Sequence, residues 1–221
     1  MSLITTSSSL SEYSNEEEYE DEYFETYTGE EVPTDGHSTE WMEELQENIV
    51  DWLHSPGNSP SSGLTDEQIE YIYDNMEDSL DLLSETLTRV ERGVHFEDHD
   101  YNVGDQIQDE ATFRSFSRSQ EASLNYIRET FIDGDGITIY KTEGSVGHFD
   151  VTRFDDTFIE EEESFVDIQS LTIKNVVMID DDDEMVRHRQ FLDAIGLDDM
   201  AVEESHINII PEYIRVVEVG E

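Results

Sequence analysis

Apolar residues first recur at helical spacing in the stretch that begins near residue 38. Trp41, Leu45 and Ile49 lie four residues apart, so they would share one face of a helix. This helix would begin at the capping residue Ser38, with acid in its first turn, and would end before Pro56. We therefore predict a helix whose apolar face packs in a core.

A second helix is predicted from residue 65. Thr65 and Gln68 have the spacing of a capping box, in which each residue's side chain accepts a hydrogen bond from the other's backbone N–H. The inward side chains of this helix would be Ile69, Ile72, Tyr73 and Met76. Leucines at positions 80, 82 and 83 indicate a third, short helix.

From residue 86 the pattern changes to short, β-prone alternating runs. The predicted strands cover residues 87–94, 113–117, 137–140, 147–151, 165–168, 171–178, 207–210 and 213–219. Two helices lie among them, at 119–127 with Ala122 and Tyr126 inward, and at 185–195, ended by Gly196. Helices followed mostly by short strands predict an α+β fold.

Composition divides the chain of 221 residues into a tail and one domain. Residues 1–37 combine acidic runs and tyrosines with few aliphatic side chains, so we predict an acidic disordered tail. The domain would span residues 38–221, with helices in 38–85 and a β-rich part in 86–221.

The strongly negative charge of the chain limits the molecules that it can bind. The formal net charge is −46, and only Lys141 and Lys174 are lysines. Acid this dense is typical of proteins that work in molar salt, where repulsion is screened over roughly 3 Å; mimicry of nucleic acid is the alternative. We expect no direct nucleic-acid binding, because no basic stripe is present. No apolar run approaches the roughly 18 residues of a membrane span.

The chain contains no cysteine, which excludes disulfides, thiolate catalysis and cysteine-based zinc sites. No signal peptide is expected, because residues 1–6 lack a basic start and a long apolar core.

Three short motifs could carry chemistry. They are Arg92-Gly93, Ser115-x-Ser117 and Glu161-x-Glu163. A guanidinium makes a forked, permanently charged contact to phosphate, and glycine lets a ligand approach the backbone closely. Serines two apart on a strand face the same side. The middle motif lies in a longer run, Phe-x-Ser-Phe-Ser-x-Ser-x-x-Ala from residue 113, preceded by Val-Gly-Asp-x-Ile from residue 103.

In their order and setting, these motifs resemble those of the NAD-dependent mono-ADP-ribosyltransferases whose signature is Arg, Ser-x-Ser and Glu-x-Glu. The resemblance implies N-terminal helices packed on two small, mostly antiparallel β-sheets. It also implies NAD⁺ as co-substrate, no metal, and a protein substrate with an acceptor arginine. Such a transferase would be cytoplasmic at high salt or associated with a phage or archaeal-virus particle.

The resemblance also assigns roles in catalysis. Arg92 would bind the pyrophosphate and Gly93 the nicotinamide carboxamide. Ser115 would orient Glu163, the catalytic glutamate, which would hold the ribose 2′-hydroxyl. Glu161 would orient or deprotonate the acceptor.

Further positions would line the site. Ser117 would face the cofactor side with Ser115, and Phe116 is a candidate for packing on nicotinamide. Phe154 or Phe158, in the place of the family's target-recognition turn, could stack on an acceptor guanidinium.

The register of the glutamates has two solutions, because residues 160–163 are all glutamate. Glu160-x-Glu162 is possible beside Glu161-x-Glu163. We favour the second, because Phe165 and Asp167 then share the strand face of Glu163.

Competing interpretations remain at this stage. Glu91 stands where the family usually has an aromatic or apolar residue, so a catalytically inactive structural or interaction protein, such as a virion component, is the main alternative. His95 and His99 could bind a metal, although they lie in a predicted loop. The acidic run 180–184 lacks the spacing of a calcium loop and is expected to be solvated.

Overall fold

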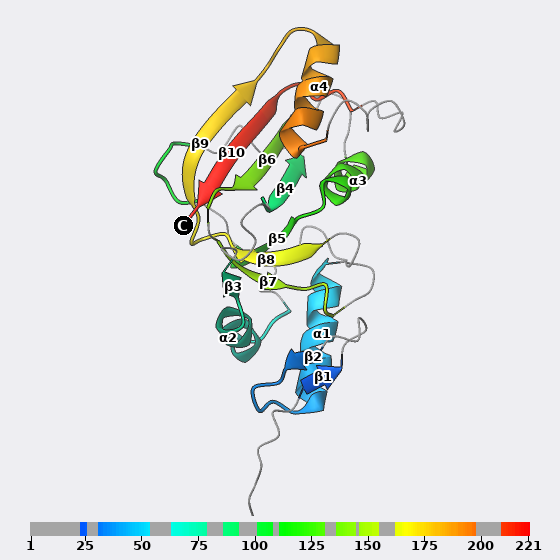
Figure 1. Ribbon diagram of the computed structural model, residues 1–221, viewed down its shortest axis with the longest axis vertical. Helices are drawn as coiled ribbons and strands as arrows, with labels where there is room; N and C mark the ends of the chain where they lie inside the picture. The colour runs from blue at the N-terminus through cyan, green and yellow to red at the C-terminus, as the bar shows by residue number, and fades with distance from the viewer. Residues whose placement is uncertain are drawn as a thin grey trace, which may run out of the picture.

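The computed structural model is an α+β structure, as the sequence predicts (Figure 1). It describes residues 23–25, 31–53, 63–78, 86–92, 101–107, 111–130, 136–144, 146–154, 162–197 and 209–221. The leucines of the predicted third helix and strand residues 207 and 208 lie outside these ranges. Ile209 and Ile210 are not in a strand.

Both predicted N-terminal helices are present. Helix α1 (Thr39–Leu53) buries Met42, Leu45 and Ile49 along one face. Helix α2 (Asp66–Asp74) begins with the expected capping box. Its inward face is rotated from the prediction, since Tyr71 is buried and Tyr73 is 39% exposed.

The long β-sheet contains eight strands in the order β3-β7-β8-β5-β4-β6-β10-β9. Their bounds are β3 (Glu77–Asp78), β4 (Thr88–Arg92), β5 (Phe113–Ser117), β6 (Ile137–Thr142), β7 (Gly147–Asp150), β8 (Glu163–Asp167), β9 (Thr172–Ile179) and β10 (Ile214–Gly220). All pairs are antiparallel except β6 with β10, which is parallel.

The expectation of two small sheets is wrong. Strands β4 and β5 pair at Thr88 and Ser117, and this single register pair joins two four-stranded halves into one sheet. Alternation within single strands carries no information about such a long-range pairing. We call β3-β7-β8-β5 the first half and β4-β6-β10-β9 the second half.

Three apolar clusters hold the fold together. Helices α1 and α2 pack on one face of the first half, around Phe113, Phe149 and Phe165. A second cluster joins side chains of both halves, including Phe116, Val166, Tyr140, Val217 and Val219. Helices α3 (Gln120–Thr130) and α4 (Glu184–Ile195) pack on the second half around Ile137, Ile139 and Ile214.

The predicted end of α4 is confirmed, whereas the predicted buried face of α3 is not. Gly196 closes α4 in the left-handed conformation, with φ of 87°, as predicted. In α3, Leu124 and Ile127 are buried, whereas Tyr126 is exposed. The expectation that Tyr126 points inward is therefore wrong, because the apolar stripe follows the aliphatic residues.

The structure describes part of the segment that is predicted to be an acidic tail. Strands β1 (Tyr23–Glu25) and β2 (Glu31–Pro33) form a two-stranded ribbon. Val32 is buried in the cluster beneath α1, and His37 stacks on Trp41 with ring centroids 3.7 Å apart. The chain therefore packs against α1 from before residue 38, through Val32 and His37.

Among the described residues, no helix combines the length and apolar character needed to cross a membrane.

Candidate functional site

The pairing of β5 with β8 places the serine motif beside the glutamate motif. In this antiparallel register Ser117 lies opposite Glu163, and Ser115 lies opposite Phe165. Residues directly opposite each other share a face, as do residues two apart on one strand. Ser115, Ser117 and Glu163 therefore lie on one face of the first half. This is also the face on which Phe165 packs against Trp52 of α1.

The hydroxyl of Ser115 donates a hydrogen bond of 2.7 Å to Oε1 of Glu163. Both side chains are partly buried, so this bond is shielded from water and stronger than it would be at an exposed position. The contact is the one that the resemblance implied between these two residues. It fixes the position of one oxygen of the Glu163 carboxylate.

The second members of the two possible glutamate registers, Glu162 and Glu163, lie in different surroundings. Glu163 is the first residue of β8 and is bonded to Ser115, whereas Glu162 is exposed and precedes the strand. Glu162 has φ of 48°, in the left-handed region that residues other than glycine rarely adopt. Glu160 and Glu161 lie outside the described residues.

Ser117 has a local structural contact. Its hydroxyl accepts a hydrogen bond from the Ser119 backbone N–H, at 2.9 Å, and lies 3.1 Å from the Ser119 carbonyl oxygen. The Ser119 hydroxyl in turn accepts from the N–H of Ala122 in the first turn of α3. Ser117 thus links the end of β5 to the start of α3, and its predicted contact with NAD⁺ stays a prediction.

Strand β4 carries the arginine motif. Thr88 is paired with Ser117, so positions 88, 90 and 92 lie on the sheet face that continues from Ser115 and Ser117. The side chain of Arg92 and all of Gly93 lie outside the described part of the chain. The neighbouring Arg89 donates a 2.9 Å hydrogen bond to the Ser115 carbonyl and so ties β4 to β5.

The structure contradicts two of the aromatic expectations. Phe116 alternates with Ser115 and Ser117, so it points to the opposite face, where it is buried between the two halves of the sheet. Phe154 is wholly buried against Phe149, and its carbonyl accepts a hydrogen bond from Gln46 of α1. Neither ring can contact a ligand in this conformation. Phe158 lies outside the described residues.

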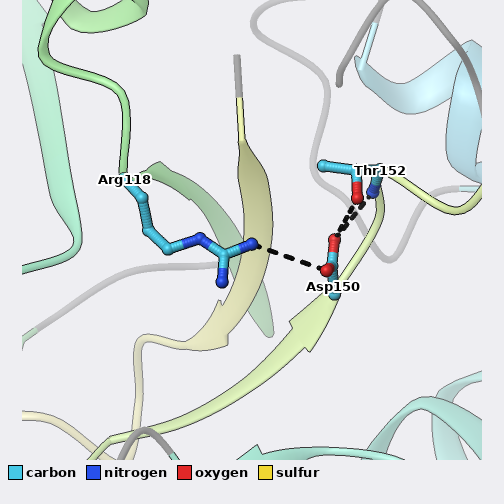
Figure 2. Close-up of polar contacts among 3 residues, drawn as sticks. All are labelled: Arg118, Asp150 and Thr152. Atoms are coloured by element: carbon cyan, nitrogen blue, oxygen red, sulfur yellow. Dashed lines mark hydrogen bonds and ion pairs between the residues drawn. The ribbon is translucent and has the colours of Figure 1, made fainter. Parts of the chain in front are cut away.

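One ion pair was missed from the sequence. The guanidinium of Arg118, just beyond β5, lies 3.5 Å from Oδ2 of Asp150 on β7 (Figure 2). Oδ1 of Asp150 accepts hydrogen bonds from the backbone N–H and the hydroxyl of Thr152, at 2.9 and 2.7 Å. The two charged residues are 32 positions apart, and in a chain with so many carboxylates the sequence cannot single out the partner.

The last residue of β8, Asp167, forms a hydrogen bond with a tyrosine of α2. Tyr73 of α2 donates to Oδ2 of Asp167 at 3.2 Å. Burial raises the pKa of Tyr73 to about 12, and the nearby Asp167 carboxylate adds to this effect because it disfavours a second negative charge. Tyr73 is therefore a neutral donor over the whole physiological pH range.

Within the ranges that the structure describes, no three metal-ligating side chains come together. The histidine pair His95 and His99 falls outside those ranges.

No protein-family model and no curated protein matches the sequence. Among solved structures, the chain is similar to the toxin Vis, an ADP-ribosyltransferase from Vibrio splendidus. The identity is 10% and the TM-score 0.39, over 82% of this chain and 69% of that chain. For Vis in complex with agmatine the values are 11% and 0.38, over 82% and 70%.

The chain is also similar to the catalytic domain of VahC from Aeromonas hydrophila. The identity is 15% and the TM-score 0.32, over 81% of this chain and 83% of that chain. At such identities and TM-scores these similarities establish no function, so a functional proposal has to rest on the residues of this chain.

Proposed function

We propose that this protein transfers ADP-ribose from NAD⁺ to a protein side chain, with Glu163 as the catalytic carboxylate. The observation that carries the proposal is the hydrogen bond from Ser115 to Glu163. It joins the second and third of three motifs that occur in the order of the ADP-ribosyltransferase signature. The backbone position of Arg92, on the continuing face of β4, supports the same reading for the first motif.

The reaction needs little proton transfer at the leaving group. The bond between the ribose C1′ and the nicotinamide nitrogen breaks, and nicotinamide leaves as a neutral molecule with the bonding electron pair. Positive charge then develops on the ribose, as in the oxocarbenium-like transition state of glycoside hydrolysis. A fixed carboxylate beside that charge lowers the barrier, because it requires no reorganisation during the reaction.

Ser115 would act by holding the Glu163 carboxylate in one rotamer. A free glutamate side chain samples several rotamers, and restricting it costs conformational entropy at the moment of reaction. Because the hydrogen bond from Ser115 already restricts the Glu163 side chain in the structure, little further entropy is lost during the reaction. Ser115 is thus a positioning residue, and Glu163 is the group that would contact the ribose.

We assign arginine as the acceptor, with Glu161 as the residue that takes its proton. A guanidinium attacks only when it loses a proton, and a nearby carboxylate can accept that proton late in the reaction. With attack by a guanidinium nitrogen, a new C1′–N bond replaces the broken one. The charge of −46 supports a protein that works in molar salt, so the assays belong at molar KCl as well as at low salt.

The experiment is a transfer assay with labelled NAD⁺ in molar KCl. Two acceptors are compared: a small guanidine such as agmatine, and a protein extract. The wild-type chain should release nicotinamide and label an acceptor, and Glu163→Gln should lower the rate by about 10³-fold. Glu70→Gln, on the exposed side of α2, is the matched control and should behave as wild type. Equal inactivity of wild type and Glu163→Gln would remove the proposal.

A non-enzymatic role on the same fold is the alternative, and the acidic, tyrosine-rich N-terminal stretch favours it. Such a protein would co-purify with a particle in a salt-resistant manner and would not bind NAD⁺ in calorimetry. Binding of NAD⁺ that is lost in an Arg92→Ala variant would contradict this alternative.

A further inference from the structure

The start of β8 is held by backbone hydrogen bonds from the ends of both neighbouring strands, and by polar side chains on the sheet face opposite Glu163. The backbone N–H of Arg118 donates to the Glu162 carbonyl at 3.2 Å, and that of Val151 donates to the Glu163 carbonyl at 3.3 Å. Arg118 and Val151 directly follow β5 and β7, the two strands that flank β8. The backbone on either side of the Glu162–Glu163 junction is therefore fixed from both neighbours.

The ion pair between Arg118 and Asp150 connects these two anchors. Strand β8 lies between β5 and β7, so the Arg118 side chain has to cross β8 to reach Asp150 (Figure 2). Asp150 also fixes the turn that follows it, through its two hydrogen bonds from Thr152. The guanidinium and this turn thus span the first residues of β8 on the sheet face opposite Glu163. We call Arg118, Asp150 and Thr152 the β8 clamp.

The surroundings of the β8 clamp make a purely stabilising role a poor explanation. The side chains of Arg118 and Asp150 are only 17% and 19% exposed, so both charges have lost most of their hydration. Nε of Arg118 and Oγ of Ser164, the residue opposite Asp150 on β8, are buried and have no hydrogen-bond partner. Unpaired buried polar atoms lower stability, and an apolar pair would fill the same space at less cost.

The backbone conformation of Glu162 is a second, independent reason to assign the β8 clamp a role beyond stability. Its φ of 48° is unfavourable for a residue with a Cβ, and such conformations persist only where the surroundings impose them. The bond from Arg118 to the Glu162 carbonyl is one such restraint. The conformation lies directly before Glu163, so any relaxation at Glu162 would rotate the first residue of β8.

We propose that Arg118 and Asp150 are positioning residues, whose ion pair holds the Glu162–Glu163 junction so that the Glu163 carboxylate meets the hydroxyl of Ser115. The catalytic consequence rests on the proposed function of Glu163. The structural consequence does not, because it concerns only the backbone at the start of β8. The two are tested separately.

The structural test is amide hydrogen exchange, measured by NMR on the full chain in molar KCl. The variants are Arg118→Met, Asp150→Asn and the double variant, and Arg128→Met on the exposed surface of α3 controls for the loss of a positive charge. The amides of residues 118 and 151 should exchange at least tenfold faster in each clamp variant. The amide of Val217 in β10 and the control variant should be unchanged. Unchanged exchange at both residues 118 and 151 would overturn the proposal, whatever the activity.

The catalytic test is a comparison of kcat and KM for NAD⁺ cleavage. Each clamp variant should lower kcat about 10-fold to 30-fold and change KM for NAD⁺ by less than threefold. The double variant should be no worse than either single variant, because both remove the same contact. Arg118→Lys keeps the charge and should recover part of the loss.

The outcomes separate the two claims. Faster exchange with an unchanged kcat would overturn the role in catalysis. An additive double variant, or a fall confined to thermal stability, would do the same. A wild-type chain that does not cleave NAD⁺ would defeat the proposed function, while the exchange rates would still decide whether the clamp holds β8.

Discussion

Strands β8 and β10 occupy equivalent central places in the two halves of one sheet, yet they differ in what they bury. Strand β10 is paired on both sides, with β6 and β9, and its buried residues Ile214, Val217 and Val219 are apolar. Strand β8 is also paired on both sides, but it begins with Glu163 and the fully buried Ser164. Apolar packing alone explains the buried residues of β10, but it does not explain those at the start of β8.

The difference indicates where the sequence departs from the apolar packing that would give the most stable fold. Around the start of β8, polar groups of Ser115, Arg118 and Asp150 form hydrogen bonds or an ion pair with specific partners, while Nε of Arg118 and Oγ of Ser164 have none. The second half is not free of such atoms, since Oγ1 of Thr138 on β6 is also buried without a partner. What sets the first half apart is the concentration of polar groups around one carboxylate. Sequences break the rules of stable packing mainly at functional sites.

The largest expected effect tests whether the two halves share one core. Phe116→Ala should lower the free energy of unfolding by about 3–5 kcal/mol, because the ring is buried between the halves and leaves a cavity. Urea unfolding in molar KCl measures this, with Tyr126→Ala, exposed on α3, as control. A small stability loss together with a large loss of NAD⁺ affinity would instead restore Phe116 as a ligand contact.

The next effect concerns the serines of the first half. Ser115→Ala should lower kcat by about 10²-fold, equivalent to roughly 2.7 kcal/mol, because the Glu163 carboxylate loses the donor that fixes its rotamer. Ser117→Ala should act mainly on stability, by about 1 kcal/mol, because its hydroxyl bonds the Ser119 backbone at the start of α3. Steady-state kinetics and urea unfolding of both variants would contradict this account if the two effects were reversed.

A smaller effect compares the unpartnered hydroxyls of the two halves. Ser164→Ala and Thr138→Val each remove a buried hydroxyl that makes no hydrogen bond, so each should raise the free energy of unfolding by about 1 kcal/mol. Val217→Thr, the reverse change in β10, should lower it by a similar amount. Thermal and urea unfolding measure all three. A marked loss of stability in Ser164→Ala would show that its hydroxyl has a partner.

The smallest effect is a dependence on alkaline pH. The pKa of Tyr73 is raised from 10 to about 12, so the folded state holds its proton where the unfolded state has released it. This contribution to stability is complete below about pH 10 and is lost as the pH rises toward 12. Tyr73→Phe should therefore reduce the fall in stability over that window, measured by urea unfolding at a series of pH values. An unchanged slope would contradict the assignment.

Much of the fold follows from local patterns. The capping box of α2, the glycine that ends α4 and the alternation of β5 and β8 each act within a few residues, so the sequence alone predicts them. Alternation places Ser115 and Glu163 on one face only in the observed register of β5 with β8, because a slip of one residue would turn one of them to the other face.

The rest depends on contacts between distant segments. The joining of both halves into one sheet rests on one pairing, between Thr88 and Ser117, and the ribbon before α1 is fixed by the burial of Val32. Phe154 looks like a loop aromatic in sequence, but its neighbours in space place it in the core. Arg118 directly follows β5 and Asp150 ends β7, and only the order β5-β8-β7 brings them together.

The most direct test of the central claim is a crystal structure of the chain with NAD⁺, grown in molar salt. We predict that the nicotinamide ribose lies against the β5–β8 face, with its 2′-hydroxyl within about 3 Å of the Glu163 carboxylate. Arg92 should contact the pyrophosphate in the same complex. NAD⁺ bound elsewhere, or Glu163 turned away from a ribose that is present, would contradict it.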